Sequence, residues 1–547
     1  MKMVAAVFAD FEQTFLGGPS QLQTPLGGRP VIQRTLTRLM RVEGLDARCL
    51  FVRPRDRAVA EAAVRAAGLD GSVEVLAADD GHRRRRELIR AARKWNLHAW
   101  RGGLLGTTWF DEYVEAHCVA RVLEHYACDA VLCLDGHQPM LDSRFSGQML
   151  ARRREYGAET EFVFTQAPPG LAGVLLGQEI VQRLLKHDVP LGVFVSYRPE
   201  LPRVDPINQP MCVQIDASVA QTPARLTADT RRSRELLAAA LAELGDEPSS
   251  AELCSWLRRP GHDPAGPLPL EVEIELTTED PLPQTRLRPR GARVPRRCLQ
   301  DMERLSELAR ELGAYDDRLV VLGGHGDPLA HAGFGEACRR VREGGVCGLA
   351  VVTPMTVFSE EAAHAMFSCG VDVVQVRVDA DTRETYRALH GADLYERVVA
   401  NVTAVERARR ERLRPQPIVV CSITRCAATL PELEPFYSRW VQATGWSVIE
   451  GFNDYGGLLP PDSLVHSEPP VRGPCRRLDR RLMLLADGSV ALCGQDVVGE
   501  FKLGRWTDGP ISDIWAGRRL ADVRTLHSRG EWGNLPICGR CREWFRP

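Results

Sequence analysis

Short apolar runs alternate with amphipathic stretches from the start of the chain to about Thr230. Each run has the length of a strand, and in the stretches between them apolar residues recur at the helical period of about 3.6 residues. Strands separated by helices in this way form a parallel sheet that is covered on both faces. We expect the strands at residues 4–10, 48–54, 73–79, 129–136 and 160–167.

A second alternation of the same kind begins at Leu270. Repeated βα units of this length predict a full or partial barrel. Its expected strands lie at residues 270–276, 318–324, 348–354, 372–379 and 417–424.

Proline, glycine and cysteine mark the boundaries between these segments. The stretch "RRPGHDPAGPLPL" precedes the second series and is typical of a linker. We therefore predict an α/β protein with five segments. They are a first domain at 1–232, a helical and Pro/Gly-rich linker at 233–268, a βα barrel at 269–456, a loop at 457–474 and a cysteine-bearing module at 475–547.

Composition restricts the classes of function. The 547 residues are 44% hydrophobic and 26% charged, as in ordinary globular proteins, and the net charge of −2 gives no basic field for nucleic acid. No apolar run approaches the roughly 20 residues of a membrane span, and the first residues turn acidic too early for a signal peptide. We therefore expect a cytoplasmic protein without a nucleic-acid or membrane partner, in which most of the 16 cysteines are free thiols.

Four cysteines near the end of the sequence have the spacing of metal ligands. Asp487–Gly488 predicts a tight hairpin turn between Cys475 and Cys493, which would bring these two cysteines to the same end of the hairpin. A C-x-x-C knuckle adds Cys538 and Cys541. Four thiolates suit either a [4Fe–4S] cluster or structural zinc, and the spacing does not separate the two.

The segment around these cysteines, "GPC…LMLLADGSVALCGQD…LGRWTDGPISDIWAG…CGRC", resembles the SPASM module of radical S-adenosylmethionine enzymes. The resemblance implies an iron–sulfur cluster rather than zinc. The family pattern continues with further cysteines after the C-x-x-C pair, and none follows Cys541 here. We therefore expect one auxiliary cluster.

The second series resembles a radical S-adenosylmethionine barrel. "VVLGGHGDPLAHAGF" matches the G-x-G-E-P-L strand end at Gly324 and Gly326, with Asp327 in place of glutamate. "VVQVRVDADTRETYRALHG" resembles the S-l-D-g segment, with Asp379 kept and Arg377 in place of serine. The resemblance implies that Gly324, Gly326, Asp327 and Arg377 line a residual S-adenosylmethionine-like pocket.

The cluster loop of that family has lost its ligands. In the stretch "ELTTEDPLPQTRLRPRG", the three places of C-x-x-x-C-x-x-C hold Asp280, Gln284 and Leu287. Thiolates hold iron in such clusters, and leucine cannot bind it at all. We therefore expect a barrel that keeps the fold and does not cleave S-adenosylmethionine. The alternative is an active enzyme with unusual cluster ligation.

The first domain resembles a sugar nucleotidyltransferase of the cytidylyltransferase kind. "VLCLDGHQPMLD" is similar to its magnesium-binding motif, with His137 at the aspartate place and Asp135 two residues before it, and "RLTADTRRS" retains Asp229. The resemblance implies a weak nucleotide-like pocket at Asp135 and Asp229. The phosphate loop lies within residues 3–28, which contain no lysine or arginine, so we expect no nucleotidyl transfer.

The joint arrangement resembles the spiro-SPASM proteins. It implies a nucleotidyltransferase-like Rossmann-type sheet, a radical-SAM-like partial TIM barrel and a small cysteine-rich SPASM-like module. We interpret the chain as an iron–sulfur pseudoenzyme that binds a peptide or a sugar-nucleotide-like ligand, or regulates a partner enzyme. The alternatives are a sugar nucleotidyltransferase, an active radical enzyme and a zinc-stapled scaffold.

Overall fold

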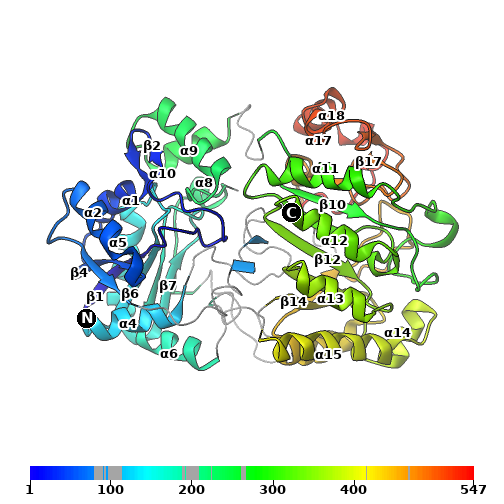
Figure 1. The fold of residues 1–547 in the computed structure, drawn as a ribbon, viewed down its shortest axis with the longest axis horizontal. Coiled ribbons are helices and arrows are strands. Elements are labelled where there is room, and N and C mark those ends of the chain that lie inside the picture. Colours follow the sequence, from blue (N-terminus) through cyan, green and yellow to red (C-terminus); the bar gives the residue numbers. More distant parts are fainter. Residues whose placement is uncertain are drawn as a thin grey trace. The chain divides into compact units, whose positions relative to one another are not determined.

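The computed structural model describes residues 1–78, 90–91, 94–95, 114–187, 191, 209–222, 224–259, 266–413, 416–465 and 468–546. The chain divides into two compact units, Met1–Pro264 and Ala265–Pro547 (Figure 1). Within the described part of the chain, no helix is long and apolar enough to span a membrane.

A seven-stranded sheet forms the centre of the first unit, in the order β5-β4-β1-β6-β8-β7-β9. The expected strands are all present. One difference from the predicted parallel sheet is β8, which pairs antiparallel with both β6 and β7. The strands are β1 (Met3–Phe8), β4 (Ala47–Val52), β5 (Glu74–Ala77), β6 (Ala130–Asp135), β7 (Phe162–Thr165), β8 (Val174–Gly177) and β9 (Cys212–Val213), and β2 (Pro25–Leu26) pairs separately with β3 (Arg29–Pro30).

Helices cover both faces of this sheet, as the alternation along β1 requires. Val4, Ala6 and Phe8 pack in one core cluster with α4 and α6, whereas Met3, Ala5 and Val7 pack in another with α1, α2 and α5. The helices are α1 (Val31–Leu39), α2 (Arg57–Ala66), α4 (Ala116–Tyr126), α5 (Ser143–Tyr156), α6 (Gln178–His187) and α8 (Ala217–Ala220).

The helical part of the predicted linker belongs to the first unit. α9 (Arg231–Leu244) and α10 (Ser250–Leu257) bury Leu237, Leu241 and Trp256 in a core cluster that also contains Leu26 and Val31. The expected boundary at residues 232 and 233 falls inside α9. Residues 260–265 of the Pro/Gly-rich stretch lie outside the described residues.

The second unit contains an open nine-stranded sheet in the order β15-β14-β13-β12-β11-β10-β16-β17-β18. Its first six strands along the chain are parallel, which agrees with the predicted partial barrel. They are β10 (Glu271–Glu275), β11 (Leu319–Gly323), β12 (Gly348–Thr353), β13 (Val373–Arg377), β14 (Ile418–Arg425) and β15 (Ser447–Gly451).

The helices of the second unit pack against one face of this sheet. Val272 and Ile274 of β10 lie in the main apolar cluster, together with residues of the helices that follow the strands. Glu271, Glu273 and Glu275 alternate with them and therefore face the other side. The helices are α11 (Met302–Gly313), α12 (Phe334–Glu343), α13 (Glu360–Ser368), α14 (Arg383–His390), α15 (Tyr395–Glu411) and α16 (Leu433–Thr444).

The cysteine-bearing module continues the barrel sheet. β16 (Arg481–Leu484) pairs parallel with β10, and β17 (Ser489–Ala491) and β18 (Lys502–Arg505) extend it antiparallel. The hairpin turn forms as predicted, with Gly488 at φ 87°, a conformation that favours glycine. α17 (Ile511–Trp515) begins where Glu311 of α11 accepts hydrogen bonds from Ile511 N and Ser512 N, both at 2.9 Å, and α18 (Arg518–Ser528) follows. Figure 1 shows α17 and α18 in red above α11.

Candidate functional site

The four C-terminal cysteines lie in one neighbourhood. Cys475 is within electrostatic range of Cys493, Cys538 and Cys541, and Cys541 is also within range of the other two. Burial, reinforced by the neighbouring thiols, raises the pKa of the Cys538 thiol to about 12. Among the residues that the structure describes, no three His, Cys, Asp or Glu side chains are grouped as ligands around a single metal ion. The thiols are thus close together without forming a closed coordination shell.

Backbone N–H groups point at two of these sulfurs. Glu543 N lies 3.3 Å from Cys541 Sγ, and the backbone N–H of Gln495 donates to the Cys493 thiol. Burial raises the pKa of both thiols, whereas these donors oppose that rise because they favour the thiolate. The donor set is therefore chemically suited to a centre that needs thiolates, as an iron–sulfur cluster does.

Two residues without any sequence signal support the cysteines through the backbone. Cys475 N donates to His527 Nδ1 at 3.2 Å, and Arg472 Nη2 donates to the carbonyl oxygen of Cys538 at 2.7 Å. His527 lies on an amphipathic helix and Arg472 in a loop, so neither belongs to a motif that spacing could reveal.

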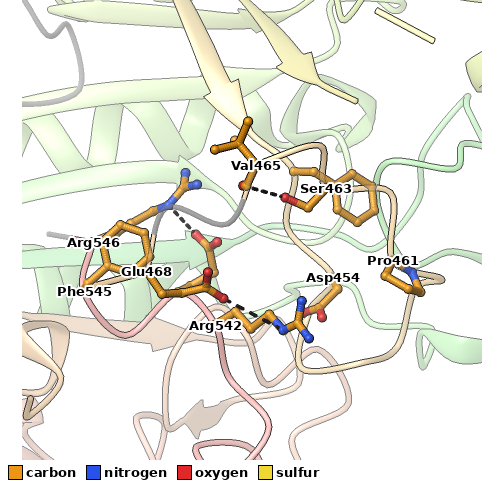
Figure 2. Close-up of a pocket in the computed structure, with 11 residues that line it drawn as sticks. Asp454, Pro461, Ser463, Val465, Glu468, Arg542, Phe545 and Arg546 are labelled. Carbon is orange, nitrogen blue, oxygen red and sulfur yellow. Dashed lines mark hydrogen bonds and ion pairs between the residues drawn. The ribbon is translucent and has the colours of Figure 1, made fainter. Parts of the chain in front are cut away.

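A small pocket with a cavity volume of about 30 Å³, partly open to solvent, is lined in part by the residues that follow Cys541 in the sequence (Figure 2). Glu543 is buried and accepts from Arg546 Nε at 2.9 Å, and Arg542 Nε lies 3.9 Å from Glu468. The Arg546 guanidinium lies directly against Gly451, so a side chain added there would displace it. The lining residues are Gly451, Phe452, Asp454, Pro461, Ser463, Val465, Glu468, Arg542, Glu543, Phe545 and Arg546.

The degenerate cluster loop is closed by its own side chains. Asp280 forms an ion pair with Arg290, and both side chains are almost completely buried. Leu287 is 4% exposed and packs in an apolar cluster with Leu389, Cys426, Phe452 and Leu459. Gln284 lies against Gly391, where an added Cβ would come within 2.6 Å of Gln284 Oε1. Each of the three ligand places therefore has an ordinary structural contact.

Behind this loop, a buried polar network holds Asp379. Arg288 Nη1 lies 2.8 Å from Asp379 Oδ2, and Thr424 Oγ1 donates to Asp379 Oδ1 at 3.0 Å. His390 Nε2 is 3.8 Å from the same carboxylate, and His390 Nδ1 is 2.9 Å from Thr285 Oγ1. Burial alone would raise the pKa of Asp379, but Arg288 and His390 bring it below its ordinary value. The carboxylate therefore stays charged within the protein.

The other predicted barrel residues lie at the carboxyl ends of β11 and β13. Gly324 N donates to Glu273 Oε1 at 2.8 Å, and Gly326 packs so tightly against the 277–279 backbone that no side chain fits. Asp327 is fully buried and accepts from Thr353 Oγ1 at 2.8 Å, and burial raises its pKa to about 7. Arg377 is half-buried, and no ion pair joins it to Asp327 in the described part of the chain.

In the first unit, the predicted magnesium ligands are engaged internally. His137 N and His137 Nδ1 both contact Asp135 Oδ1, at 2.9 and 3.0 Å. Asp229 forms a buried two-point ion pair with Arg225 and accepts from Thr227 Oγ1 at 2.8 Å. Ala228 N donates to the carbonyl oxygen of His137 at 2.8 Å, so the segments that carry Asp135 and Asp229 lie side by side.

The phosphate loop is not without cations, which corrects the sequence-based view of its charge. Arg53 and Arg55, which follow β4, reach the loop and pair with Asp10 and Glu12. A local count of charges could not reveal this, because the arginines come from the next strand–helix connection. Their charges nevertheless offset the loop's own carboxylates.

Comparison with known proteins gives two family matches. The model of the radical SAM superfamily matches residues 292–420, and that of the SPASM iron–sulfur cluster-binding domain matches residues 475–542. The first match begins after Leu287, and the second includes all four cysteines. An uncharacterised protein of Treponema pallidum (strain Nichols) is 26% identical over 289 residues, which are 51% of this chain and 79% of that protein.

Several solved structures are similar to parts of the chain. SuiB of Streptococcus suis, bound to the precursor peptide SuiA, is 10% identical with a TM-score of 0.40 and covers 71% of this chain and 98% of its own. A cytidylyltransferase from Leptospira borgpetersenii serovar Hardjo-bovis is 16% identical with a TM-score of 0.33, over 47% and 93% of the two chains. BtrN in complex with AdoMet and 2-DOIA is 15% identical with a TM-score of 0.34, over 50% and 93%.

The two family-model matches, over residues 292–420 and 475–542, show that the chain carries a radical SAM superfamily domain and an SPASM iron–sulfur cluster-binding domain.

Proposed function

We propose that this protein binds one [4Fe–4S] cluster through Cys475, Cys493, Cys538 and Cys541, and that its barrel has become a binding or regulatory scaffold that no longer cleaves S-adenosylmethionine. The SPASM match over residues 475–542 favours iron–sulfur over zinc. When bound, such a cluster supplies one-electron redox chemistry, and this chain supplies the thiolates and the N–H donors that stabilise them.

The observation that carries the proposal is the closed loop at residues 280–291. Reductive cleavage requires a cluster held by three thiolates with one iron open, and these places hold Asp280, Gln284 and Leu287. Asp280 is paired with Arg290 and Leu287 is packed among apolar side chains, so neither place offers a donor for iron. The polar network around Asp379 gives this loop a structural role instead.

The scaffold role rests on the groups that remain at the carboxyl ends of the strands, where ligands bind in βα folds. Asp327 is buried beneath the end of β11, whereas Arg377 at the end of β13 is half-buried and offers a positive charge that an anionic group of a peptide or a sugar-nucleotide-like ligand could engage. Regulation of a partner enzyme through the same surface is the other form of this proposal.

Metal analysis of the full chain tests the cluster. We expect anaerobically purified protein, reconstituted with iron and sulfide, to hold about four iron and four sulfide per chain and to absorb near 400 nm, roughly where thiolate-to-iron bands lie. Tightly bound zinc without iron would show that the cysteines hold a structural zinc site and no cluster. Retention of the cluster by a Cys538→Ala variant would contradict the ligand assignment.

A further inference from the structure

Arg472 connects two aromatic rings to the third cysteine. Its guanidinium lies 4.8 Å from the centre of the Trp532 ring and 5.9 Å from that of Trp544, while Nη2 donates to the carbonyl oxygen of Cys538 at 2.7 Å. Stacking on indole rings fixes the plane of a guanidinium. The two indole rings therefore hold the Arg472 guanidinium in place, and the guanidinium in turn holds the carbonyl group of Cys538.

His527 connects the same tryptophan to the first cysteine. Its ring centre lies 6.2 Å from that of Trp532, and Nδ1 accepts a hydrogen bond from Cys475 N. A backbone N–H can only donate, so Nδ1 is unprotonated and the proton of the neutral ring is on Nε2. His527 is 2% exposed, which leaves its ring little freedom to turn.

Trp532 therefore contacts both residues that hold cysteine backbone groups. Arg472 and His527 thus both contact the Trp532 ring, to which the His527 ring is tilted by 47°, and together they link Cys475 and Cys538, which are 63 positions apart in the sequence. Arg472 Nε and His527 Nε2 are buried and have no hydrogen-bond partner among the described residues. Both are donors, and a sulfur-rich centre is a hydrogen-bond acceptor.

The positive charges near the cysteines also favour an iron–sulfur centre at this place. Arg472 acts on the Cys538 thiol and Arg477 on those of Cys493 and Cys541, in each case favouring the thiolate. Four thiolates outweigh the charge of an iron–sulfur core, so the occupied centre is anionic. Nearby cations stabilise it and raise its reduction potential, because reduction adds a further negative charge.

We propose that Arg472, Trp532 and His527 form a clamp that positions Cys475 and Cys538 for the iron–sulfur centre, and that Arg472 also sets its reduction potential. This inference rests on the proposed cluster. The three are positioning residues, because they act through the cysteines. Outer-shell partners of metal ligands typically change metal affinity about 10–100-fold when they are removed.

The test uses the full chain with matched variants. His527→Leu removes the acceptor for Cys475 N, whereas His527→Asn retains one at an equivalent place. Arg472→Met removes the donor and the charge, Arg472→Lys keeps the charge, and Arg472→Gln keeps a donor without charge. Arg524→Met is the control, because Arg524 also stacks on a tryptophan, 4.3 Å from the Trp515 ring centre, and bonds a carbonyl, that of Leu478, without touching a cysteine.

We expect His527→Leu and Arg472→Met to release iron to a chelator about tenfold faster than wild type, while His527→Asn and Arg524→Met remain near wild type. The midpoint potential should fall in Arg472→Gln and stay near wild type in Arg472→Lys. Equal acceleration in Arg524→Met overturns the clamp, and an unchanged potential in Arg472→Gln overturns the role of Arg472 in setting the potential, although the cluster stands in both cases. A wild-type chain that takes up no iron overturns the cluster itself, and the clamp with it.

Discussion

Arg288 and Asp379 form a buried ion pair that joins the degenerate cluster loop to the end of β13, with Arg288 Nη1 2.8 Å from Asp379 Oδ2. Their side chains are 5% and 0% exposed. The loop thus has a fixed internal anchor at Arg288.

Breaking this pair from one side should destabilise the protein strongly. Arg288→Met leaves the Asp379 carboxylate charged and buried without its main partner, and such losses typically cost about 3–5 kcal/mol. We expect a corresponding drop in the free energy of unfolding measured by urea denaturation. Arg383→Met is the matched control, because its partner Asp393 is exposed and the change should have little effect. Similar destabilisation by both variants would contradict the anchor.

The ion pair between Arg288 and Asp379 also predicts how the stability of the folded protein changes at acidic pH. The folded protein lowers the pKa of Asp379, so its contribution to stability is present above the ordinary value of the carboxyl and is lost as pH falls through the lowered value. Arg288→Met should therefore lose less stability than wild type on acidification below about pH 4, the ordinary pKa of aspartate. If wild type and Arg288→Met lost stability equally at acidic pH, the ion pair would not be what lowers the pKa of Asp379.

The sequence identified most of the strands but not the contacts between distant segments. Residues 318–324 are an apolar run and correspond to β11, as expected of a buried parallel strand, whereas residues 270–276 alternate apolar residues with glutamate and correspond to β10. Arg288 and Asp379 are 91 positions apart, and no local pattern pairs them. His527 and the continuation of the barrel sheet through β16 escaped prediction for the same reason, since both depend on which distant segments meet.

Asp327 should affect stability in the opposite sense to Asp379, because its contribution to stability falls as pH rises. Burial raises its pKa to about 7, so the folded state favours the protonated carboxyl, and this contribution to stability is lost as pH rises through that value. Asp327→Asn keeps an acceptor for Thr353 Oγ1 and cannot ionise. The variant should therefore lose less stability than wild type between about pH 4, the ordinary pKa of aspartate, and about pH 7, the raised value. Parallel curves for the two proteins would show that Asp327 titrates normally.

The first unit should not release pyrophosphate from nucleoside triphosphates. Asp135 is bonded to His137 and Asp229 to Arg225, and Arg53 is paired with Asp10 in the loop that would receive the phosphates. We expect no pyrophosphate above background from a panel of nucleoside triphosphates with magnesium and sugar phosphates. Activity that disappears in Asp135→Asn and Asp229→Asn would establish the nucleotidyltransferase alternative instead.

The barrel should not cleave S-adenosylmethionine, even when the C-terminal cluster is fully assembled. Cleavage needs an electron from a cluster with one open iron, and the loop that would hold it presents a carboxylate paired with Arg290, an amide and a buried leucine. The assay incubates reconstituted protein with S-adenosylmethionine and dithionite under anaerobic conditions and measures 5′-deoxyadenosine. We expect none above the level of heat-denatured protein.

A Leu287→Cys variant on its own should not change this result, because it adds one thiol to a place still enclosed by Leu389 and Phe452. Product formed by the wild-type chain and abolished in Cys475→Ala would instead make the C-terminal cluster the electron source and the barrel an active enzyme.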